Sequence, residues 1–137
     1  MVEISRFCIP YTPFSGEVAS ARVGIVSTAG VHLKSQEPFV PEGDTTYRLI
    51  PAGASTEQLT ITHDHYDHSD ARKDINCVFP VEILRELAAE GRLGSTTSEH
   101  LCMGFSQAMR EIKERVAPEI ATTVRKWKPD AVLLTAG

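Results

Sequence analysis

The chain has 137 residues, of which 42% are hydrophobic and 23% charged, and its formal net charge is −4. This composition is typical of one globular domain, excludes a disordered chain, and argues against non-specific binding to nucleic-acid backbones. No apolar run in the sequence approaches the roughly 20 residues that a membrane-spanning helix needs. The N-terminus carries Glu3 and has no apolar signal core, so we expect a cytoplasmic protein without nucleic-acid or membrane partners.

Strands and helices are predicted to alternate along the first two thirds of the chain. Apolar or β-branched runs predict strands at residues 23–26, 47–50 and 58–62. A helix is predicted from Pro80 to Gly91, because proline favours the first turn of a helix and glycine its end.

The last third of the chain predicts a loop, a long helix and a final strand. Residues 95–104 are mostly small and polar and are predicted as a loop. A helix is predicted over residues 105–124, in which Pro118 is expected to cause a kink or a break. The apolar stripe of this helix consists of Phe105, Met109, Ile112, Val116, Ile120 and Val124. Residues 131–135 are apolar on both faces, which is typical of a central parallel strand.

These elements predict one α/β domain over residues 1–137, with an open, mainly parallel sheet and flanking helices of the Rossmann or flavodoxin-like kind. A buried parallel strand normally leads into a helix that covers the sheet, whereas only a short exit turn ends this chain. The sheet is therefore expected to be incomplete at its C-terminal end. Ligands of open α/β sheets gather at the carboxyl ends of strands, so a functional loop is expected to begin near Gly137.

The three cysteines are Cys8, Cys77 and Cys102. They are widely spaced and form no CxxC pair, which argues against a disulfide framework or a cysteine zinc site. Apolar neighbours surround Cys77 and Cys102, so both are predicted to be buried, unreactive thiols. Cys8 lies in the irregular lead-in segment.

The densest chemistry follows the third predicted strand, where three histidines and three aspartates lie within residues 63–70. Within it, His63, His65, Asp67 and His68 form an HxHxDH pattern, which resembles the metallo-β-lactamase superfamily and implies a metal-dependent hydrolase. A second interpretation is a polar active-site loop without metal, in which these groups orient a substrate or transfer protons. A third is a solvated loop of a non-catalytic α/β binding module.

A family resemblance extends from about residue 21 to the end of the chain. It is carried, in order, by residues 28–34, 42–44, 47–48 and 50–51, by His63 with residues 66–67, by Asp70 with residues 73–80, and by residues 87–91 and 130–137. Two of these segments are distinctive: Lys-Asp-Ile-Asn-Cys-Val-Phe-Pro at 73–80 and Leu-Leu-Thr-Ala-Gly at 133–137. The chain resembles the selenoprotein B family of glycine, sarcosine, betaine and D-proline reductases.

The resemblance implies a selenocysteine directly after Gly137, encoded by UGA, so this chain is expected to be the N-terminal part of a longer reductase subunit, truncated before its nucleophile. The implied activity is reductive cleavage of a C–N bond in an amine-bearing small molecule. No cofactor is expected within the chain itself. The implied partners are a subunit that carries a pyruvoyl group and a dithiol or thioredoxin-like reductant, and the fragment alone is expected to be inactive.

The resemblance also suggests which residues serve the reaction. His63, Tyr66, Asp67 and Asp70 are the candidates for a shell that supports catalysis. The candidates for substrate binding are Thr28, Gly30 and His32, which follow the first predicted strand. Where this chain has residues 63–68, the D-proline reductase members of the family have a sequence similar to His-Gly-Gly-Tyr-Asp-Asn. His65 and His68 are therefore not expected to belong to the shared chemistry.

Overall fold

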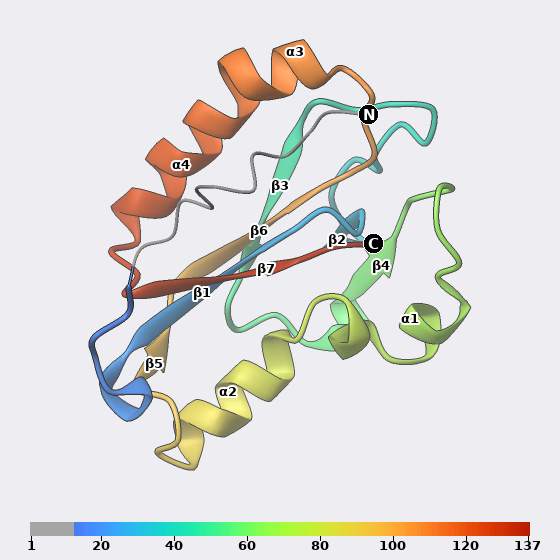
Figure 1. Cartoon of the computed structure of the whole chain (residues 1–137). Helices are drawn as coiled ribbons and strands as arrows, with labels where there is room; N and C mark the ends of the chain where they lie inside the picture. Colours follow the sequence, from blue (N-terminus) through green and yellow to red (C-terminus); the bar gives the residue numbers. More distant parts are fainter. Residues whose placement is uncertain (1–12) are drawn as a thin grey trace, which may run out of the picture.

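The computed structural model describes residues 13–137 and contains one main sheet, with β1 (Arg22–Ser27) at its centre. On one side β1 pairs in parallel with β5 (Ser95–Thr96) and β6 (Glu99–Met103), and on the other with β7 (Ala131–Thr135). The remaining strand, β3 (Tyr47–Pro51), pairs antiparallel with β6. The parallel strands therefore end along one edge of the sheet, which Figure 1 shows to the right of β1, β6 and β7.

A second, two-stranded sheet lies beside the carboxyl ends of these strands. It pairs β2 (Val31–Leu33) antiparallel with β4 (Leu59–Ile61). Four short helical segments lie outside the strands and the longer helices: η1 (Val18–Ser20), η2 (Thr56–Gln58), α1 (Ser69–Lys73) and η3 (Ile75–Cys77).

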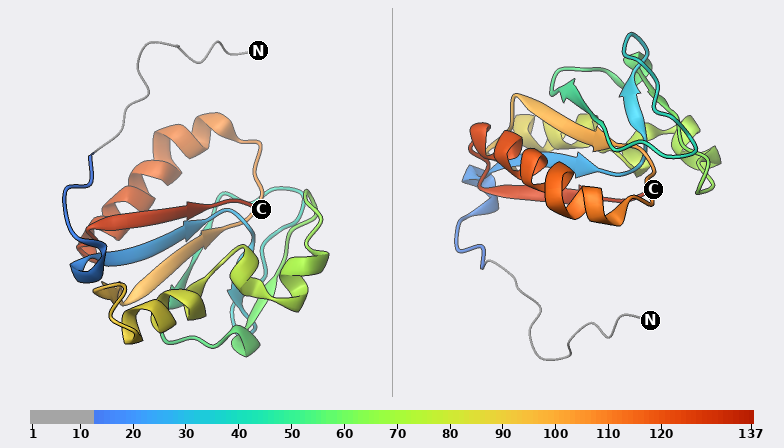
Figure 2. Two further views of the ribbon diagram at one scale, coloured as in Figure 1. Left: turned by 60° about the horizontal axis from the view of Figure 1, so that its bottom comes forward. Right: turned by 90° about the horizontal axis from the view of Figure 1, so that it is seen from above.

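Two longer helices cover opposite faces of the main sheet (Figure 2). On one face α2 (Val81–Ala89) packs Leu84 into a core that includes Ile25, Phe79 and Cys102. On the other face α4 (Ala117–Lys126) contributes to a second core. The buried members of that core are Leu101, Met103, Val116, Val124 and Trp127. None of the helices in residues 13–137 is long and apolar enough to cross a membrane.

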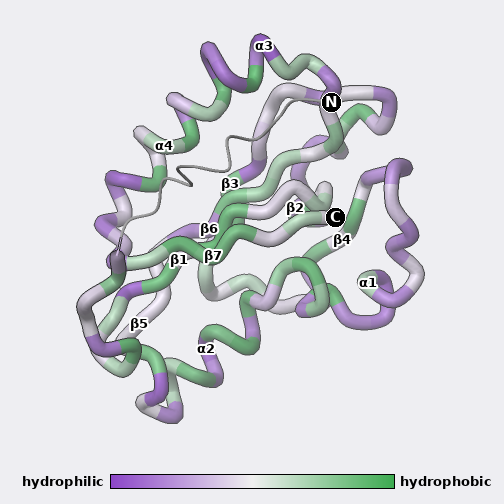
Figure 3. The backbone as a smooth tube through the Cα atoms, viewed as in Figure 1, coloured by the Kyte–Doolittle hydropathy of each residue, from purple (hydrophilic) through white to green (hydrophobic). Residues whose placement is uncertain are grey.

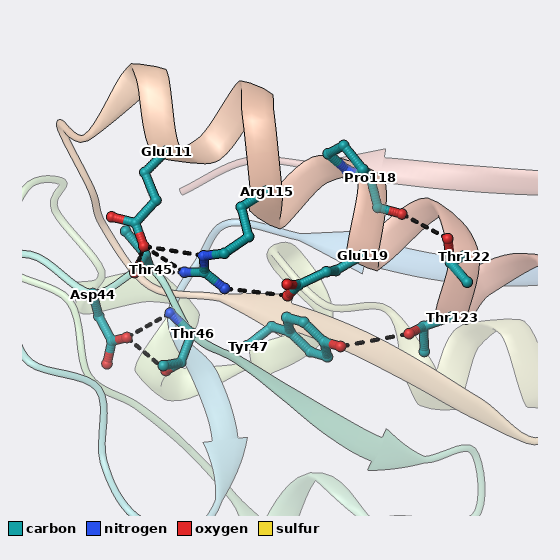
Figure 4. A network of polar contacts seen from close by, with 10 residues as sticks. All are labelled: Asp44, Thr45, Thr46, Tyr47, Glu111, Arg115, Pro118, Glu119, Thr122 and Thr123. Carbon is teal, nitrogen blue, oxygen red and sulfur yellow. Dashed lines mark hydrogen bonds and ion pairs between the residues drawn. The ribbon is translucent and has the colours of Figure 1, made fainter.

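A polar network holds the second helical layer against the edge of the sheet (Figure 4). The guanidinium of Arg115 donates to Glu119 at 3.2 Å and to Thr45, which precedes β3, at 3.3 Å. Further along, the Tyr47 hydroxyl lies 3.5 Å from Oγ1 of Thr123 in α4. Because these contacts are exposed or only partly buried, each is expected to add little to the stability of the fold.

The fold class predicted from the sequence is confirmed, because the main sheet is mostly parallel and helices flank both faces. The predicted strands at 23–26 and 47–50 lie within β1 and β3, and the one at 58–62 contains β4. The predicted helix from Pro80 corresponds to α2.

The prediction of a loop at residues 95–104 is wrong, because this segment contains β5 and β6. Although the segment contains polar residues, it forms β6, which lies between β1 and β3. Thr97 and His100 are buried within the sheet, where the Thr97 hydroxyl donates to the carbonyl of Glu99 at 2.6 Å. Hydrogen bonds of this kind let polar side chains occupy a core position, which a pattern of apolar residues does not reveal.

The predicted helix at 105–124 begins later than expected, and Pro118 does not break it. The helix starts with α3 (Met109–Glu111), widens into a π-helical turn (Ile112–Val116) and continues as α4, with Pro118 in the first turn. The junction residue Ala117 keeps helical angles of φ −64° and ψ −41°. The π-helical turn accommodates the missing N–H of the proline, since it lies directly before it.

The final strand differs from the prediction in its position, because β7 is an edge strand of the sheet as far as residues 13–137 are concerned. It pairs in parallel with β1, as predicted. Leu133 and Leu134 are 38% and 74% exposed, and Figure 3 shows apolar residues along β7.

Candidate functional site

A pocket of about 330 Å³ lies where the three long parallel strands end. Thr28 follows β1, Phe105 follows β6, and Gly137 follows β7, and all three line the pocket. His63 and His65 line it from the loop after β4. The pocket therefore occupies the place where open α/β sheets bind their ligands.

Gly30 joins the end of β1 to the histidine loop. Its N–H donates to the carbonyl of Met103 at 2.9 Å, and its own carbonyl accepts from the N–H of Thr62 at 2.9 Å. Gly30 has a φ of 70°, a left-handed conformation that favours glycine. A Cβ at this position would lie 2.3 Å from the Thr62 carbonyl oxygen.

Gly30→Ala is therefore expected to destabilise the protein by at least about 2 kcal/mol, because left-handed strain and a backbone clash add together. The matched control is Gly53→Ala, since Gly53 has a negative φ and a Cβ added there would meet no atom within 4 Å. Urea unfolding of the two variants measures the difference. Equal midpoints would show that Gly30 does not constrain the loop.

His63 is 5% exposed, and its Nδ1 accepts a hydrogen bond from the backbone N–H of His65 at 3.1 Å. Burial lowers the pKa of His63, and the neighbouring His65 and His68 lower it further. The ring is therefore neutral at pH 7 with its proton on Nε2. Among the described residues no hydrogen bond engages Nε2, so this N–H is a free donor at the pocket.

Aromatic rings form one wall of the site. His65 stacks on Phe105 with ring centroids 3.3 Å apart and planes 10° from parallel. Tyr66 packs 4.7 Å from His63, and its hydroxyl donates to the carbonyl of Ala29 at 3.0 Å. Burial raises the pKa of Tyr66 to about 12, so this hydroxyl stays protonated. A Cβ on Gly137 would lie 2.5 Å from the Tyr66 ring, so the ring packs directly on the end of β7.

The two aspartates predicted as supporting residues are exposed and do not line the pocket. Asp67 accepts from the N–H of Ser69 at 2.9 Å, a bond that lowers its pKa and closes a turn just before α1. Asp70 pairs with Lys73 at 2.8 Å on the surface of α1. Both carboxylates thus serve the start of a short helix in this structure.

The three residues predicted to bind substrate occupy different environments. Thr28 is exposed at the pocket, whereas Gly30 contributes only backbone hydrogen bonds. His32 is 2% exposed, and its ring nitrogens contact the carbonyl of Leu33 and the hydroxyl of Thr62, each at 2.9 Å. His32 does not line the pocket and instead holds the strand that leads to His63.

The four candidate metal ligands are not gathered around a common point. His65 stacks on Phe105, and Nε2 of His68 lies 3.3 Å from the guanidinium of Arg72. Within residues 13–137, no group of three or more His, Cys, Asp or Glu side chains is arranged to hold a metal ion. The hydrolase interpretation therefore has no geometric support.

Zinc analysis of the purified protein by mass spectrometry is expected to give a substoichiometric content, and a chelator is expected to leave the unfolding midpoint unchanged. The physical reason is that a zinc site needs three or four ligands at about 2.0–2.3 Å from one point. Stoichiometric zinc whose removal changes the unfolding midpoint would contradict this expectation.

The predicted burial of the cysteines is confirmed for Cys102 and wrong for Cys77. Cys102 is buried as predicted, its sulfur accepts from the N–H of Val31 at 3.1 Å, and burial raises its pKa to about 11. The prediction that Cys77 is buried is wrong: it ends η3 on the surface and is exposed. Cys8 lies outside the described residues.

Sequence reasoning misses the apolar part of the pocket, which comes from Met103, Phe105 and Ile112. The periodicity of the apolar stripe predicts Phe105 inside the long helix, whereas it lies before the helix begins. Gly104, which precedes Phe105, is the one sequence signal of a break in the apolar periodicity. In the structure, a Cβ at Gly104 would lie 2.9 Å from the Phe39 ring.

An open, mostly parallel sheet with a polar and aromatic pocket at its carboxyl edge is typical of α/β proteins that bind small ligands. The sequence model of the glycine/sarcosine/betaine reductase selenoprotein B family matches residues 47–137. This match covers more than half of the chain, and the chain belongs to that family.

Named relatives agree with this assignment. The D-proline reductase subunit gamma of Acetoanaerobium sticklandii is 38% identical over 128 residues, which are 93% of this chain and 53% of that protein. The glycine reductase complex component B subunits gamma of Symbiobacterium thermophilum and Carboxydothermus hydrogenoformans are 26% and 23% identical, over 93% of this chain and 31% of their own lengths. The chain thus spans about half the length of the first relative and less of the other two. No solved structure matches it.

Proposed function

We propose that this chain is part of the catalytic subunit of an amino-acid reductase complex, and that the pocket at the carboxyl edge of the sheet is its reaction site. The observation that carries the proposal is that Gly137 lines the same pocket as His63 and Thr28. In the proposed longer subunit a selenocysteine follows Gly137, so its side chain would begin at this pocket. The substrate is an amino acid or related amine, as the names of the relatives indicate for those proteins.

The residues of the pocket fit an anionic nucleophile. A selenolate supplies an attacking atom that is ionised at neutral pH, whereas an ordinary cysteine with a pKa near 8.5 is mostly protonated there. The free Nε2–H of His63 and the hydroxyl of Thr28 are hydrogen-bond donors for such a charge. No Asp or Glu side chain is among the described residues that line the pocket, so none opposes it.

The role proposed for His63 is that of a neutral donor. Its lowered pKa keeps the ring uncharged at pH 7, and the bond from His65 fixes the proton on Nε2. A donor held in place before the reaction stabilises negative charge without reorganising, which is the largest catalytic contribution in many enzymes. Tyr66 acts through position, because its ring packs on the end of β7 and its hydroxyl is anchored to Ala29.

Met103, Phe105 and Ile112 provide the apolar side of the pocket. They reduce the access of water and so strengthen the hydrogen bonds that His63 and Thr28 donate. Two electrons are needed to break a C–N bond reductively, and the proposed source is a dithiol or thioredoxin-like protein. A partner subunit with a pyruvoyl group is proposed to hold the substrate amine.

The test is a reductase assay of the native complex that contains this chain, with dithiothreitol as the electron donor. D-proline, glycine, sarcosine and betaine are supplied separately, and cleaved products are quantified by mass spectrometry. The proposal expects dithiol-dependent cleavage of at least one of them. A complete native complex that cleaves none of the four would overturn it.

A further inference from the structure

An apolar groove of about 380 Å³ lies between α4 and the main sheet, next to β7. Its floor includes Val26 and Leu134, and Ile120 and Val124 of α4 form its wall. Leu134 is 74% exposed although it is a large apolar residue within a strand. A groove of this composition is typical of a surface that another element covers.

The groove continues into the reaction pocket, because Met103 and Ile112 line both. An element that fills the groove would therefore also border the pocket. This relation links the covering of the apolar surface to the completion of the site.

The edge of the sheet beside the groove is open as well. Within residues 13–137, β7 pairs only with β1, so its second edge carries no strand. Leu133 and Leu134 point to opposite faces of the strand, and both are partly or largely exposed. An edge strand that is apolar on both faces is typical of the interior of a parallel sheet and is prone to unwanted pairing when left open.

The handedness of the fold indicates which element fits here. The chain passes from β6 to β7 through α3 and α4, which lie on one face of the sheet, and β1 lies between the two strands. Connections between parallel strands are right-handed in about 98% of cases. A further parallel strand on the free edge of β7 continues in the same direction, so its connecting helix belongs on the same face as α4. The groove lies on that face.

We propose that this groove and the free edge of β7 bind a helix and a strand from the remaining part of the full-length reductase subunit. The helix packs beside α4 on Leu134, and the strand pairs in parallel with β7. The inference rests on the proposed function, since it requires the longer subunit. The chain spans 53% of the D-proline reductase subunit gamma, so a subunit of that length has ample chain for a strand–helix–strand unit of about 30 residues.

The test compares two variants of the full-length subunit, Leu134→Asp and Val40→Asp. Both positions are exposed in residues 13–137, at 74% and 53%, but Val40 does not line the groove. Leu134→Asp is expected to lower the melting temperature by about 5 °C or more, because it places a charge in a buried interface. Val40→Asp is expected to change it by less than about 1 °C, as surface substitutions do.

Hydrogen exchange of the wild-type full-length subunit supplies the second readout. The expected results are slow exchange, independent of protein concentration, at those amides of residues 131–135 that do not bond to β1, and fast exchange of the same amides in Leu134→Asp. Fast exchange at 131–135 in the wild type, protection that requires other subunits, or protection that grows with protein concentration would each overturn the assignment to the same chain. Absence of any longer product would remove the proposed function too, whereas a longer product with an unprotected β7 would remove only this inference.

Discussion

Replacing His63 with asparagine is expected to lower the turnover of the native reductase complex by about 100-fold, the effect of losing one preorganised donor at a reacting centre. The Oδ1 of asparagine can still accept the hydrogen bond that the N–H of His65 donates to Nδ1, so the loop keeps its anchor. What the variant loses is the free Nε2–H at the pocket. Turnover with dithiothreitol, measured at saturating substrate, reports this loss.

The matched variant is His63→Gln, whose amide nitrogen reaches the position of Nε2. It is expected to retain turnover within about 10-fold of the wild type, because a donor remains. Because the pKa of His63 is lowered, any fall in activity that its protonation causes is expected at a lower pH than for an exposed histidine. Equal activity of His63→Asn and the wild type would remove His63 from the site.

Acidification from pH 6.5 to 4 is expected to cost about 3 kcal/mol of folding free energy through His100 alone. This residue is fully buried in β6, and its Nε2 has no hydrogen-bond partner among the described residues. Burial, and secondarily the charge of Arg85, lowers the pKa of His100 to about 4 from an ordinary value of 6.5. The unfolded chain binds a proton near pH 6.5 and the folded chain only near 4, so stability is complete above 6.5 and is lost as the pH falls. Each pKa unit corresponds to about 1.36 kcal/mol.

Urea unfolding of the protein at several pH values between 7.5 and 4 measures this effect. His100→Asn keeps an acceptor for the N–H of Ile25, which donates to Nδ1 at 3.2 Å, but has no proton to gain. Its stability is expected to fall less steeply with acid than that of the wild type, by the amount assigned to His100. His68→Asn is the control, since His68 lies near the surface. An acid dependence that is the same for His100→Asn and the wild type would contradict the assignment.

Apolar runs predict the elements whose burial depends on apolar side chains. β1, β3, α2 and α4 fall in this class, and the stripe from Val116 to Val124 faces the core as expected. They do not predict β6, because His100 is polar and its burial depends on a hydrogen bond from the N–H of Ile25 in β1. The buried hydroxyl of Thr97, just before β6, bonds locally to the carbonyl of Glu99. The exposure of Cys77 also escapes prediction, because apolar neighbours along the chain do not determine which way one turn of 3-10 helix presents its side chain.

The candidate site is predictable where a residue directly follows a strand. Thr28 lies at the pocket for this reason, since parallel strands bring their carboxyl ends together. His63 follows β4 of the small antiparallel sheet, which lies beside those ends. Asp67 and Asp70 do not lie there, because the same residue types that serve catalysis also close turns and form surface ion pairs. Phe105 is not expected at the pocket, because the periodicity that places it on a helix does not reveal that the helix begins four residues later.

We propose that this chain forms the part of a selenocysteine-containing reductase subunit that leads up to the nucleophile. The most direct measurement is the DNA sequence through and beyond the codon that follows Gly137, together with the mass and selenium content of the native product. A TGA codon followed by an open frame, and a product larger than 15.0 kDa that contains selenium, are the predicted results. A TAA or TAG codon with no coding continuation and a product of 15.0 kDa without selenium would contradict the account.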